Sequence, residues 1–468
     1  MTAQPTRPLH RRPAVWVAAA VAVAVVLAAA SVAVIRGRRG VGPTASQRVG
    51  ALVATIPMGD SWSSAASWTY VQGDVGYVAW EENDKHLEVR SVELPGGRER
   101  WRVSLPSPGG QSWTGLIGFS GGVVAVPAEF PDRPGPAVAL LGGAEKDRWT
   151  VPMRYSEALW FFAKTVVHTD EVNDRLDFLD ARTGTVISSA PHPRSPVGHP
   201  FLLSVRTPAD YTVPSATGDA PGRNTKGYPG VPGDHDPVVQ FFPDGSARLF
   251  DAGTGALLAR GSDVGEANDF FLAYDGRLYV AGTRSGYELV SYDLATLSGR
   301  RPLYRPEPAA LLLDVAPCGR DRLCVLDQEG ADDSTRLHAV KTDGGGEIWS
   351  RPAPGGRLLT GFGDRVLVRD DSGERSLLFD QDGQRIVDTP GRVVRVDLDT
   401  ALVFSGRLTT SPANHHVTTL DVRTGRTVAD LGTLGGIAAG DCSWNSTVIL
   451  CPTAGDFRIW RIAVGSAG

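Results

Sequence analysis

The chain has 468 residues, a formal net charge of −5 at pH 7, and hydrophobic and charged fractions of 42% and 21%, which are ordinary for a globular protein. Its 47 basic residues are outnumbered by 52 acidic ones, and no basic run lies beyond the N-terminus, so a nucleic-acid-binding surface is not expected. The 55 glycines and 33 prolines indicate a chain with many turns.

The N-terminal segment is unlike the rest of the chain. Residues 1–13 hold three arginines, and residues 14–35 form an uncharged run in which Ser31 is the only polar side chain. A helix of that length spans about 33 Å, enough to cross a bilayer. We therefore expect a cytoplasmic N-terminus at 1–13, a single-pass transmembrane helix at 14–35 and a linker at 36–49. A cleaved signal peptide ending near Ala28–Ala30 is the alternative, but the run is longer than the apolar core of such peptides.

From residue 50 onward a unit of four short strands recurs, and residues 268–305 show it most clearly. Three apolar runs with period-2 character, each ending at Gly, Asp or Ser, are followed by a shorter fourth run at 300–304. Such a pattern predicts a small antiparallel meander. A single meander cannot bury both of its faces, so it requires neighbours stacked against it.

The third strand of the unit ends in a recurring turn of the form Asp-x-x-Thr-Gly. The turns use Asp180 and Gly184, Asp251 and Gly255, Asp421 and Gly425, and Asp293 with Thr296 but without the glycine. An Asp side chain accepts hydrogen bonds from amides two or three residues on, and Gly supplies the positive φ that closes a hairpin. We therefore interpret these aspartates as structural and do not expect them to bind metal. Tryptophan opens the following strand in three units, at Trp101, Trp149 and Trp349.

Residues 191–237 interrupt the repeat with ten prolines and six glycines in 47 positions. A long irregular insertion on a regular scaffold is either disordered or a functional loop. It contains His192, His199 and the run Asp234-His235-Asp236, but consecutive residues rarely converge on one ion, and no metal site is expected. His415 and His416 are weaker candidates, because neighbours on a strand point to opposite faces.

The four cysteines form two local pairs, Cys318 with Cys324 and Cys442 with Cys451. Each pair brackets a turn between the first two strands of a unit, where facing side chains are close enough to bridge. The spacings are poor for zinc, and four buried free thiols remain the alternative. Disulfides would require an oxidising compartment. That compartment decides the orientation, because arginines flank the apolar run on both sides, and it places the body on the extracytoplasmic side.

These patterns predict an all-β fold, a β-propeller of four-stranded antiparallel blades at 50–465. The sequence predicts eight blades, with seven or nine as alternatives. Nine sets of first-to-third strands are visible, and the ninth, at 436–464, lacks its fourth strand. Residues 50–57 can supply it and so close the ring. One set, next to 191–237, is expected not to form a true blade.

Tandem units with these turns and Trp-led strands resemble the PQQ-like β-propeller repeat family. That family includes quinoprotein dehydrogenases and non-catalytic envelope proteins similar to the outer-membrane assembly lipoprotein. The anchored layout is similar to that of actinobacterial envelope proteins. The enzymes carry adjacent cysteines and a calcium set, whereas no two cysteines are adjacent here. The resemblance therefore implies no cofactor and assigns no catalytic residue.

Two functional hypotheses follow. The first is a membrane-tethered, extracytoplasmic, non-catalytic binding or scaffold module whose partner is a cell-envelope protein, peptide or glycan. The second is an extracytoplasmic enzyme, either a quinone-type oxidoreductase or a glycan-acting lyase or hydrolase. No nucleophile elbow, metalloprotease helix or phosphate-binding loop is present, which favours the first.

Overall fold

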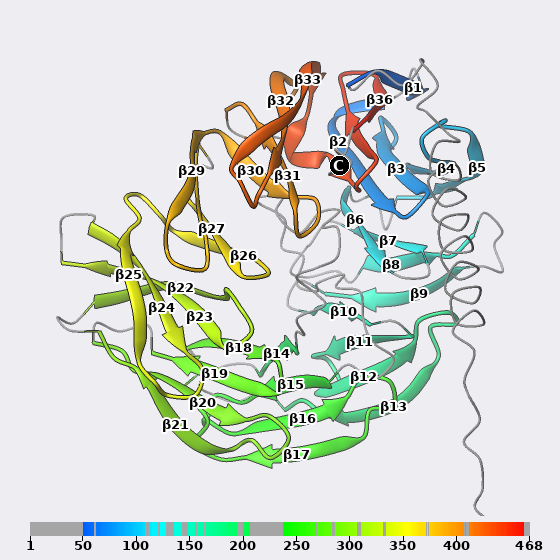
Figure 1. Ribbon diagram of the computed structural model, residues 1–468. Coiled ribbons are helices and arrows are strands. Elements are labelled where there is room, and N and C mark those ends of the chain that lie inside the picture. Colours follow the sequence, from blue (N-terminus) through cyan, green and yellow to red (C-terminus); the bar gives the residue numbers. More distant parts are fainter. Residues whose placement is uncertain are drawn as a thin grey trace, which may run out of the picture. The chain divides into compact units, whose positions relative to one another are not determined.

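The computed structural model describes residues 50–462 with internal gaps (Figure 1). The residues outside the description are 1–49, 60–61, 108–109, 111, 120–121, 128–134, 143–147, 155–156, 163, 194–199, 206–236, 267–268, 283–285, 307–309, 331–333, 371, 373, 407, 409–410 and 463–468. The predicted transmembrane helix and linker lie outside the described residues. Among those that are described, no helix has the length and apolar character needed to cross a bilayer.

The described chain folds into nine four-stranded antiparallel sheets, which we call blades 1 to 9 in chain order. Blades 1 to 3 are β2 (Trp62–Gln72), β3 (Val75–Glu82), β4 (Leu87–Glu93) and β5 (Glu99–Leu105); β6 (Trp113–Phe119), β7 (Gly122–Pro127), β8 (Gly135–Leu140) and β9 (Arg148–Met153); and β10 (Leu159–Phe161), β11 (Thr165–Asp170), β12 (Arg175–Asp180) and β13 (Val186–Pro191). Blades 4 to 6 are β14 (Phe201–Ser204), β15 (Pro237–Phe241), β16 (Ala247–Asp251) and β17 (Leu257–Gly261); β18 (Phe270–Tyr274), β19 (Arg277–Ala281), β20 (Leu289–Asp293) and β21 (Ser298–Tyr304); and β22 (Ala310–Pro317), β23 (Arg322–Glu329), β24 (Ser334–Lys341) and β25 (Glu347–Pro352). Blades 7 to 9 are β26 (Leu358–Phe362), β27 (Arg365–Arg369), β28 (Arg375–Phe379) and β29 (Arg385–Pro390); β30 (Arg392–Arg395), β31 (Thr400–Phe404), β32 (Ala413–Asp421) and β33 (Arg426–Ile437); and β34 (Ser443–Trp444), β35 (Val448–Pro452), β36 (Asp456–Arg461) and β1 (Leu52–Pro57), with the short 3-10 helix η4 (Ala439–Asp441) before β34.

The prediction of eight blades is wrong, because the set next to residues 191–237 forms a complete blade. Its first strand, β14, lies inside that stretch and pairs with β15 from Phe201 opposite Phe241 to Ser204 opposite Val238. Blade 4 is completed by β16 and β17. The irregular stretch is therefore shorter than predicted, and residues 206–236 of it lie outside the description.

The predicted closure of the ring by the N-terminal strand is confirmed. Strand β1 pairs antiparallel with β36, from Leu52 opposite Trp460 to Pro57 opposite Asp456. The first strand of the described chain is thus the fourth strand of the last blade. This pairing covers the edge of β36, which would otherwise be left with unpaired backbone groups.

Apolar residues fill every seam between consecutive blades. Nine hydrophobic clusters are present in the described residues, and each draws its members from two neighbouring blades, including blades 9 and 1. Middle strands are buried on both faces, as in β3, because each blade is packed on two sides. Figure 1 shows the first strands towards the centre of the ring and the fourth strands, such as β5, at its rim.

The fourth strands are exposed edges, and most of them contain a bulge. In eight of the nine described blades the register shifts between the third and fourth strands; the pairing of β8 with β9 runs without a shift. Bulges twist an edge strand and hinder pairing with another chain. The rim of this ring is thereby protected from edge-to-edge association.

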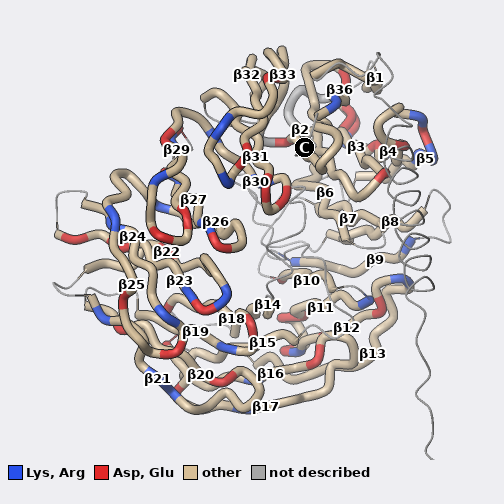
Figure 2. The backbone as a smooth tube through the Cα atoms, in the orientation of Figure 1, with Lys and Arg blue, Asp and Glu red and all other residues tan. Residues whose placement is uncertain are grey.

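The ring has two faces that differ in their connections. We call the turn face the side that carries the turns between first and second strands and between third and fourth strands, and the loop face the opposite side. The Cys318–Cys324 bridge and the Asp-x-x-Thr-Gly turns belong to the turn face, whereas Cys442 precedes β34 and Cys451 lies near the end of β35, away from the turn that joins these two strands. In Figure 2, basic and acidic residues are interspersed around the blades.

Candidate functional site

The four Asp-x-x-Thr turns are closed by the Asp side chain. Asp180 Oδ1 accepts hydrogen bonds from the backbone amides of Arg182 and Thr183 at 2.9 and 2.8 Å, and also from the Thr183 hydroxyl at 3.0 Å. The same oxygen of Asp251, Asp293 and Asp421 accepts from the Thr amide three residues on, at 2.9, 3.1 and 3.2 Å. These carboxylates hold backbone turns together.

The glycine of each full turn rests against the outer strand of the preceding blade. Gly184 has φ +68°, and a Cβ atom there would lie 2.7 Å from the Trp149 ring of blade 2. Trp149 Nε1 also donates to the carbonyl of Ala181 at 2.9 Å. Trp349 of blade 6 repeats this contact with Gly383 and with the carbonyl of Gln381. The turn motif therefore fastens each of these blades to its neighbour.

Both predicted disulfides are present. Cys318 is bonded to Cys324, and Cys442 to Cys451. Each bridge crosses the turn between the first and second strands of its blade and is buried. The four cysteines are therefore neither zinc ligands nor free thiols.

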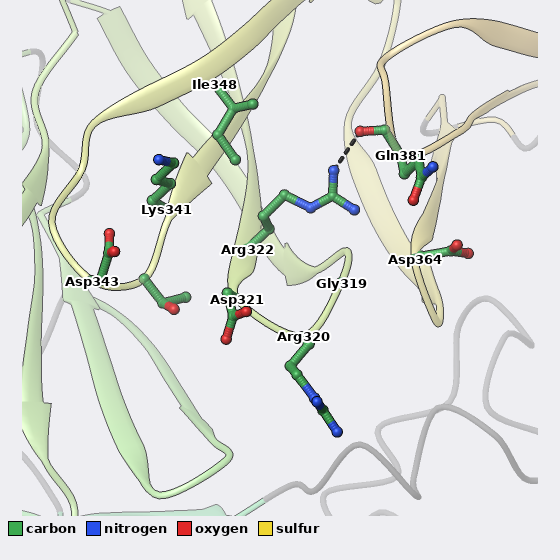
Figure 3. A pocket seen from close by; sticks show the side chains of 10 residues that line it. Gly319, Arg320, Asp321, Arg322, Lys341, Asp343, Ile348, Asp364 and Gln381 are labelled. Carbon is green, nitrogen blue, oxygen red and sulfur yellow. Dashed lines mark hydrogen bonds between the residues drawn. The ribbon is translucent and has the colours of Figure 1, made fainter.

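A hollow of about 640 Å³ opens on the turn face between blades 6 and 7 (Figure 3). It is lined by Gly319, Arg320, Asp321, Arg322, Lys341, Thr342, Asp343, Ile348, Asp364 and Gln381. The Cys318–Cys324 disulfide restrains the turn that carries the first three of these residues. The amide of Thr342 donates to the carbonyl of Asp321 at 3.1 Å, which joins the two turns of blade 6. The Arg322 guanidinium donates to the carbonyl of Gln381 and so connects blade 6 to blade 7.

The charges in this hollow are not mutually neutralised. Asp364 is paired with Arg365 at 2.8 Å, and Asp343 accepts the amide of Gly345 at 2.9 Å. Within the described part of the chain, the side chains of Arg320 and Lys341 take part in no ion pair or hydrogen bond, and both residues are exposed. Guanidinium and ammonium groups held in this way can bind carboxylates of a partner. The residues that line the hollow include no histidine or cysteine.

A buried polar cluster lies in the seam between blades 5 and 6. His338 Nε2 is 3.0 Å from Asp327 Oδ1, and His338 Nδ1 is 2.7 Å from Glu347 Oε2. Tyr287 of blade 5 donates its hydroxyl to Asp327 Oδ2 at 3.0 Å. The ring of Tyr304 lies 5.4 Å from the His338 ring. Asp327 is fully buried, whereas the Glu347 side chain is 40% exposed.

Burial and charge set the protonation of this cluster. Burial lowers the pKa of His338, but hydrogen bonds to Asp327 and Glu347 and their negative charges outweigh it, so the pKa lies above its ordinary value. Burial, reinforced by the charge of Asp327, raises the pKa of both Tyr287 and Tyr304. Both ring nitrogens of His338 face carboxylates, which leaves neither free to act as a base on a substrate. The two carboxylates lie on different sides of the ring, so these groups do not converge on one metal ion.

Of the histidines considered from sequence, His192, His415 and His416 lie in the described residues, and each has a partner close by. His192 is buried, with Nδ1 2.7 Å from Gln240 Nε2; His199 and residues 234–236 lie outside the description. His415 is buried and its Nδ1 bonds to the carbonyl of Ser405 at 2.8 Å, whereas the side chain of His416 is 47% exposed. Among the described residues, no three His, Cys, Asp or Glu side chains are arranged to hold a metal ion.

Sequence reasoning missed both the hollow and the buried cluster. The cluster had a local signal, because Asp327 follows directly on the apolar run LCVL and His338 interrupts the apolar run LHAV, both in middle strands. An ionisable residue in a middle strand must find a partner when it is buried. The hollow had no such signal, since its residues come from four turns and the adjoining strands of blades 6 and 7.

No protein-family model and no curated protein matches the chain. Several solved structures resemble it. BamB from Moraxella catarrhalis has a TM-score of 0.41 at 13% identity, covering 88% of this chain and 99% of BamB. A eukaryotic initiation factor gives 0.48 at 10% identity, covering 76% and 84%. Saccharomyces cerevisiae Sqt1 gives 0.41 at 10% identity, covering 89% and 100%.

At these identities and TM-scores the likenesses carry no argument about family or function. The resemblance to PQQ-like repeats stays a prediction. The fold follows from the nine described sheets, their nine apolar seams and the pairing of β1 with β36, and the chain is a nine-bladed β-propeller.

Proposed function

We propose that this chain is a membrane-tethered, non-catalytic recognition propeller that holds a cell-envelope protein on its turn face. The observation that carries the proposal is the hollow between blades 6 and 7, whose lining includes the Arg320 and Lys341 side chains, neither of which has an ionic partner among the described residues. Rigid scaffolds commonly present binding residues on the segments that connect their strands. The Cys318–Cys324 disulfide and the hydrogen bond from Arg322 to blade 7 restrain the conformation of this surface.

The expected partner surface is an acidic segment with an apolar side chain. Three cations and three carboxylates line the hollow, but Arg365 already neutralises Asp364, which leaves a small positive excess. Ile348 is 41% exposed at the hollow and offers an apolar contact. A protein supplies charged and apolar side chains together, whereas an uncharged glycan would use neither cation.

The tether and the compartment come from the sequence. Residues 14–35 are long enough to span a bilayer, and the two disulfides fit an oxidising environment. Strand β1 begins at Leu52 on the turn face, so a linker ending at residue 49 would join the ring on that face. A reporter fused after Gly468 should be active only if it requires export. Activity of a reporter that works only in the cytoplasm would contradict this topology.

The binding claim is tested by charge reversal in the full membrane-embedded chain. The variant Arg320→Glu/Lys341→Glu should lose most of its capture of the envelope partner identified with the native chain. The matched control is Arg182→Glu/Arg260→Glu, which makes the same change in charge at two exposed arginines of blades 3 and 4. Equal capture by the two variants would exclude the hollow as the contact surface. Turnover of a sugar or alcohol by the purified chain, with quinone and calcium added, would contradict the non-catalytic claim.

A further inference from the structure

The seam between blades 5 and 6 contains a charged group at a position where an unpaired charge is costly. Asp327 lies on β23 with no exposed surface, and its two oxygens are used by different blades: Oδ2 accepts the Tyr287 hydroxyl of blade 5, and Oδ1 faces His338 of its own blade. Its negative charge is therefore balanced inside the protein by His338. A buried carboxylate without such a partner is strongly destabilising.

The geometry around His338 sets its protonation state. A neutral imidazole has one N–H and one bare nitrogen, whereas the imidazolium has two N–H donors. Here Nδ1 and Nε2 both lie within hydrogen-bond distance of carboxylate oxygens, at 2.7 and 3.0 Å. An ionised carboxylate only accepts. Both contacts are hydrogen bonds at once only when the ring is protonated.

Every element packed around the imidazole contributes to its surroundings. From blade 5 these are Tyr287 and Tyr304; from blade 6 they are Asp327 and Glu329 on β23, Arg336 on β24 and Glu347 on β25. Arg336 lies 3.6 Å from Glu329 and donates to the Ser350 hydroxyl at 3.0 and 2.8 Å. Arg336 is thus engaged with other groups, and the charges that face His338 directly are the carboxylates of Asp327 and Glu347.

We propose that the protonated His338 is a pH-sensitive lock that holds blade 5 against blade 6 through Asp327 and Tyr287. When the ring loses a proton, one of the two carboxylates loses its donor. Glu347 is 40% exposed and can turn to water, but Asp327 is fully buried and would be left with the Tyr287 hydroxyl as its donor. The seam then contains an uncompensated charge, and local opening of the seam becomes easier.

The direction of the pH effect follows from linkage. Contact with Asp327 and Glu347 leaves the pKa of His338 in the folded chain above the ordinary value near 6.5, despite burial. The lock is therefore complete below about pH 6.5 and is lost as the pH rises through the raised pKa. Alkaline solution should loosen this seam more than the others.

The test uses the full chain in lipid nanodiscs with ¹⁵N-labelled histidine. The two ring ¹⁵N signals of His338, assigned by their loss in His338→Gln, should both have imidazolium shifts near neutral pH. The rate of amide hydrogen exchange in β20 and β23–β25, corrected for the intrinsic rate, should rise as His338 loses its proton. The corrected rate in β6–β9 should not change over the same pH range. A neutral tautomer below about pH 6, or the same exchange profile in His338→Gln and the native chain, would overturn the proposal.

Two further variants keep the test decisive if His338→Gln does not fold. Glu347→Gln removes the exposed carboxylate and should lower the titration midpoint of His338 by on the order of one pH unit. His416→Gln, at a half-exposed histidine paired with Asp430, should leave the titration midpoint of His338 unchanged. An unchanged midpoint in Glu347→Gln, or an equal shift in both variants, would contradict the lock.

Discussion

Two seams of the propeller, one between blades 5 and 6 and one between blades 7 and 8, occupy equivalent places in the repeat. Different polar contacts join the blades at these two seams. The first joins its blades through the buried charges of Asp327 and His338. In the second, a neutral hydroxyl bonds to the next blade: Ser376 of β28 is fully buried, donates to the carbonyl of Gly391 at 3.0 Å and accepts the amide of Val393 at 3.1 Å. Both arrangements satisfy buried polar groups.

The two seams should therefore differ in their response to pH and agree in their response to loss of apolar contact. The cluster at blades 7 and 8 includes Phe362, Leu378 and Leu420, and that at blades 5 and 6 includes Tyr279, Leu289 and Leu323. Apolar burial supplies most of the stability in each. The contact between Asp327 and His338 makes the stability of the first seam depend on protonation. The Ser376 hydroxyl does not titrate in the accessible pH range, so it adds no such dependence to the second seam.

The largest effect is expected for Asp327→Ala, which breaks the charged fastener. Removing one partner of a buried pair costs about 3–5 kcal/mol of the free energy of unfolding. Chemical denaturation near pH 6 measures this loss, and the pH dependence of the seam should also disappear. Asp382→Ala, at an exposed turn of blade 7, is the control and should change stability by less than about 0.5 kcal/mol. A loss no larger than that of the control would show that the charge is not buried as described.

The next largest loss of stability is expected when an apolar side chain is truncated in the seam between blades 7 and 8. Leu378 is fully buried between blades 7 and 8, and Leu378→Ala should reduce the free energy of unfolding by about 3 kcal/mol. The loss should be equal near pH 6 and near pH 9, because no group that titrates between them is removed. Val428→Ala, at a residue that is 45% exposed, is the matched control. A loss that grows with pH would show that a group titrating between these pH values stabilises this seam.

Blade 6 also differs from blade 7 in its first turn, which is bridged by the Cys318–Cys324 disulfide. Cys318→Ala/Cys324→Ala should cost about 2 kcal/mol, because a short closed loop restricts the unfolded chain only modestly. Melting with and without reductant measures the loss, and reductant should have no further effect at this turn in the variant. Free thiols on the chain purified from its native source without reductant would contradict the pairing.

The sequence specified the strands and their closure because those features are local or repeat. Period-2 runs, turn glycines and the unpartnered 50–57 strand each have a physical cause visible in a few residues. The number of blades was harder to predict. Strand β14 is only four residues long and is separated from β15 by more than 30 residues, so blade 4 does not show the regular spacing used to count the others.

The candidate sites depend on contacts between blades, which the sequence does not display. Tyr287 and Asp327 are 40 residues apart and belong to different units. Arg322 and Gln381 are 59 residues apart. Strand periodicity tells which side chains are buried, but it does not tell which residue of the next blade lies opposite. Only the ionisable positions in middle strands, Asp327 and His338, were open to inference.

The smallest effect is expected for Ser376→Ala, which removes the neutral fastener. The substitution leaves the amide of Val393 and the carbonyl of Gly391 without this partner, at a cost of about 1–2 kcal/mol. The loss should be the same near pH 6 and near pH 9, because a serine hydroxyl does not titrate there. Chemical denaturation of Ser376→Ala and Asp327→Ala at both pH values compares the two losses in the free energy of unfolding. The contrary outcome is that the stability lost in Ser376→Ala changes with pH as much as the stability of the seam between blades 5 and 6 does. The pH dependence would then belong to the propeller as a whole and not to His338.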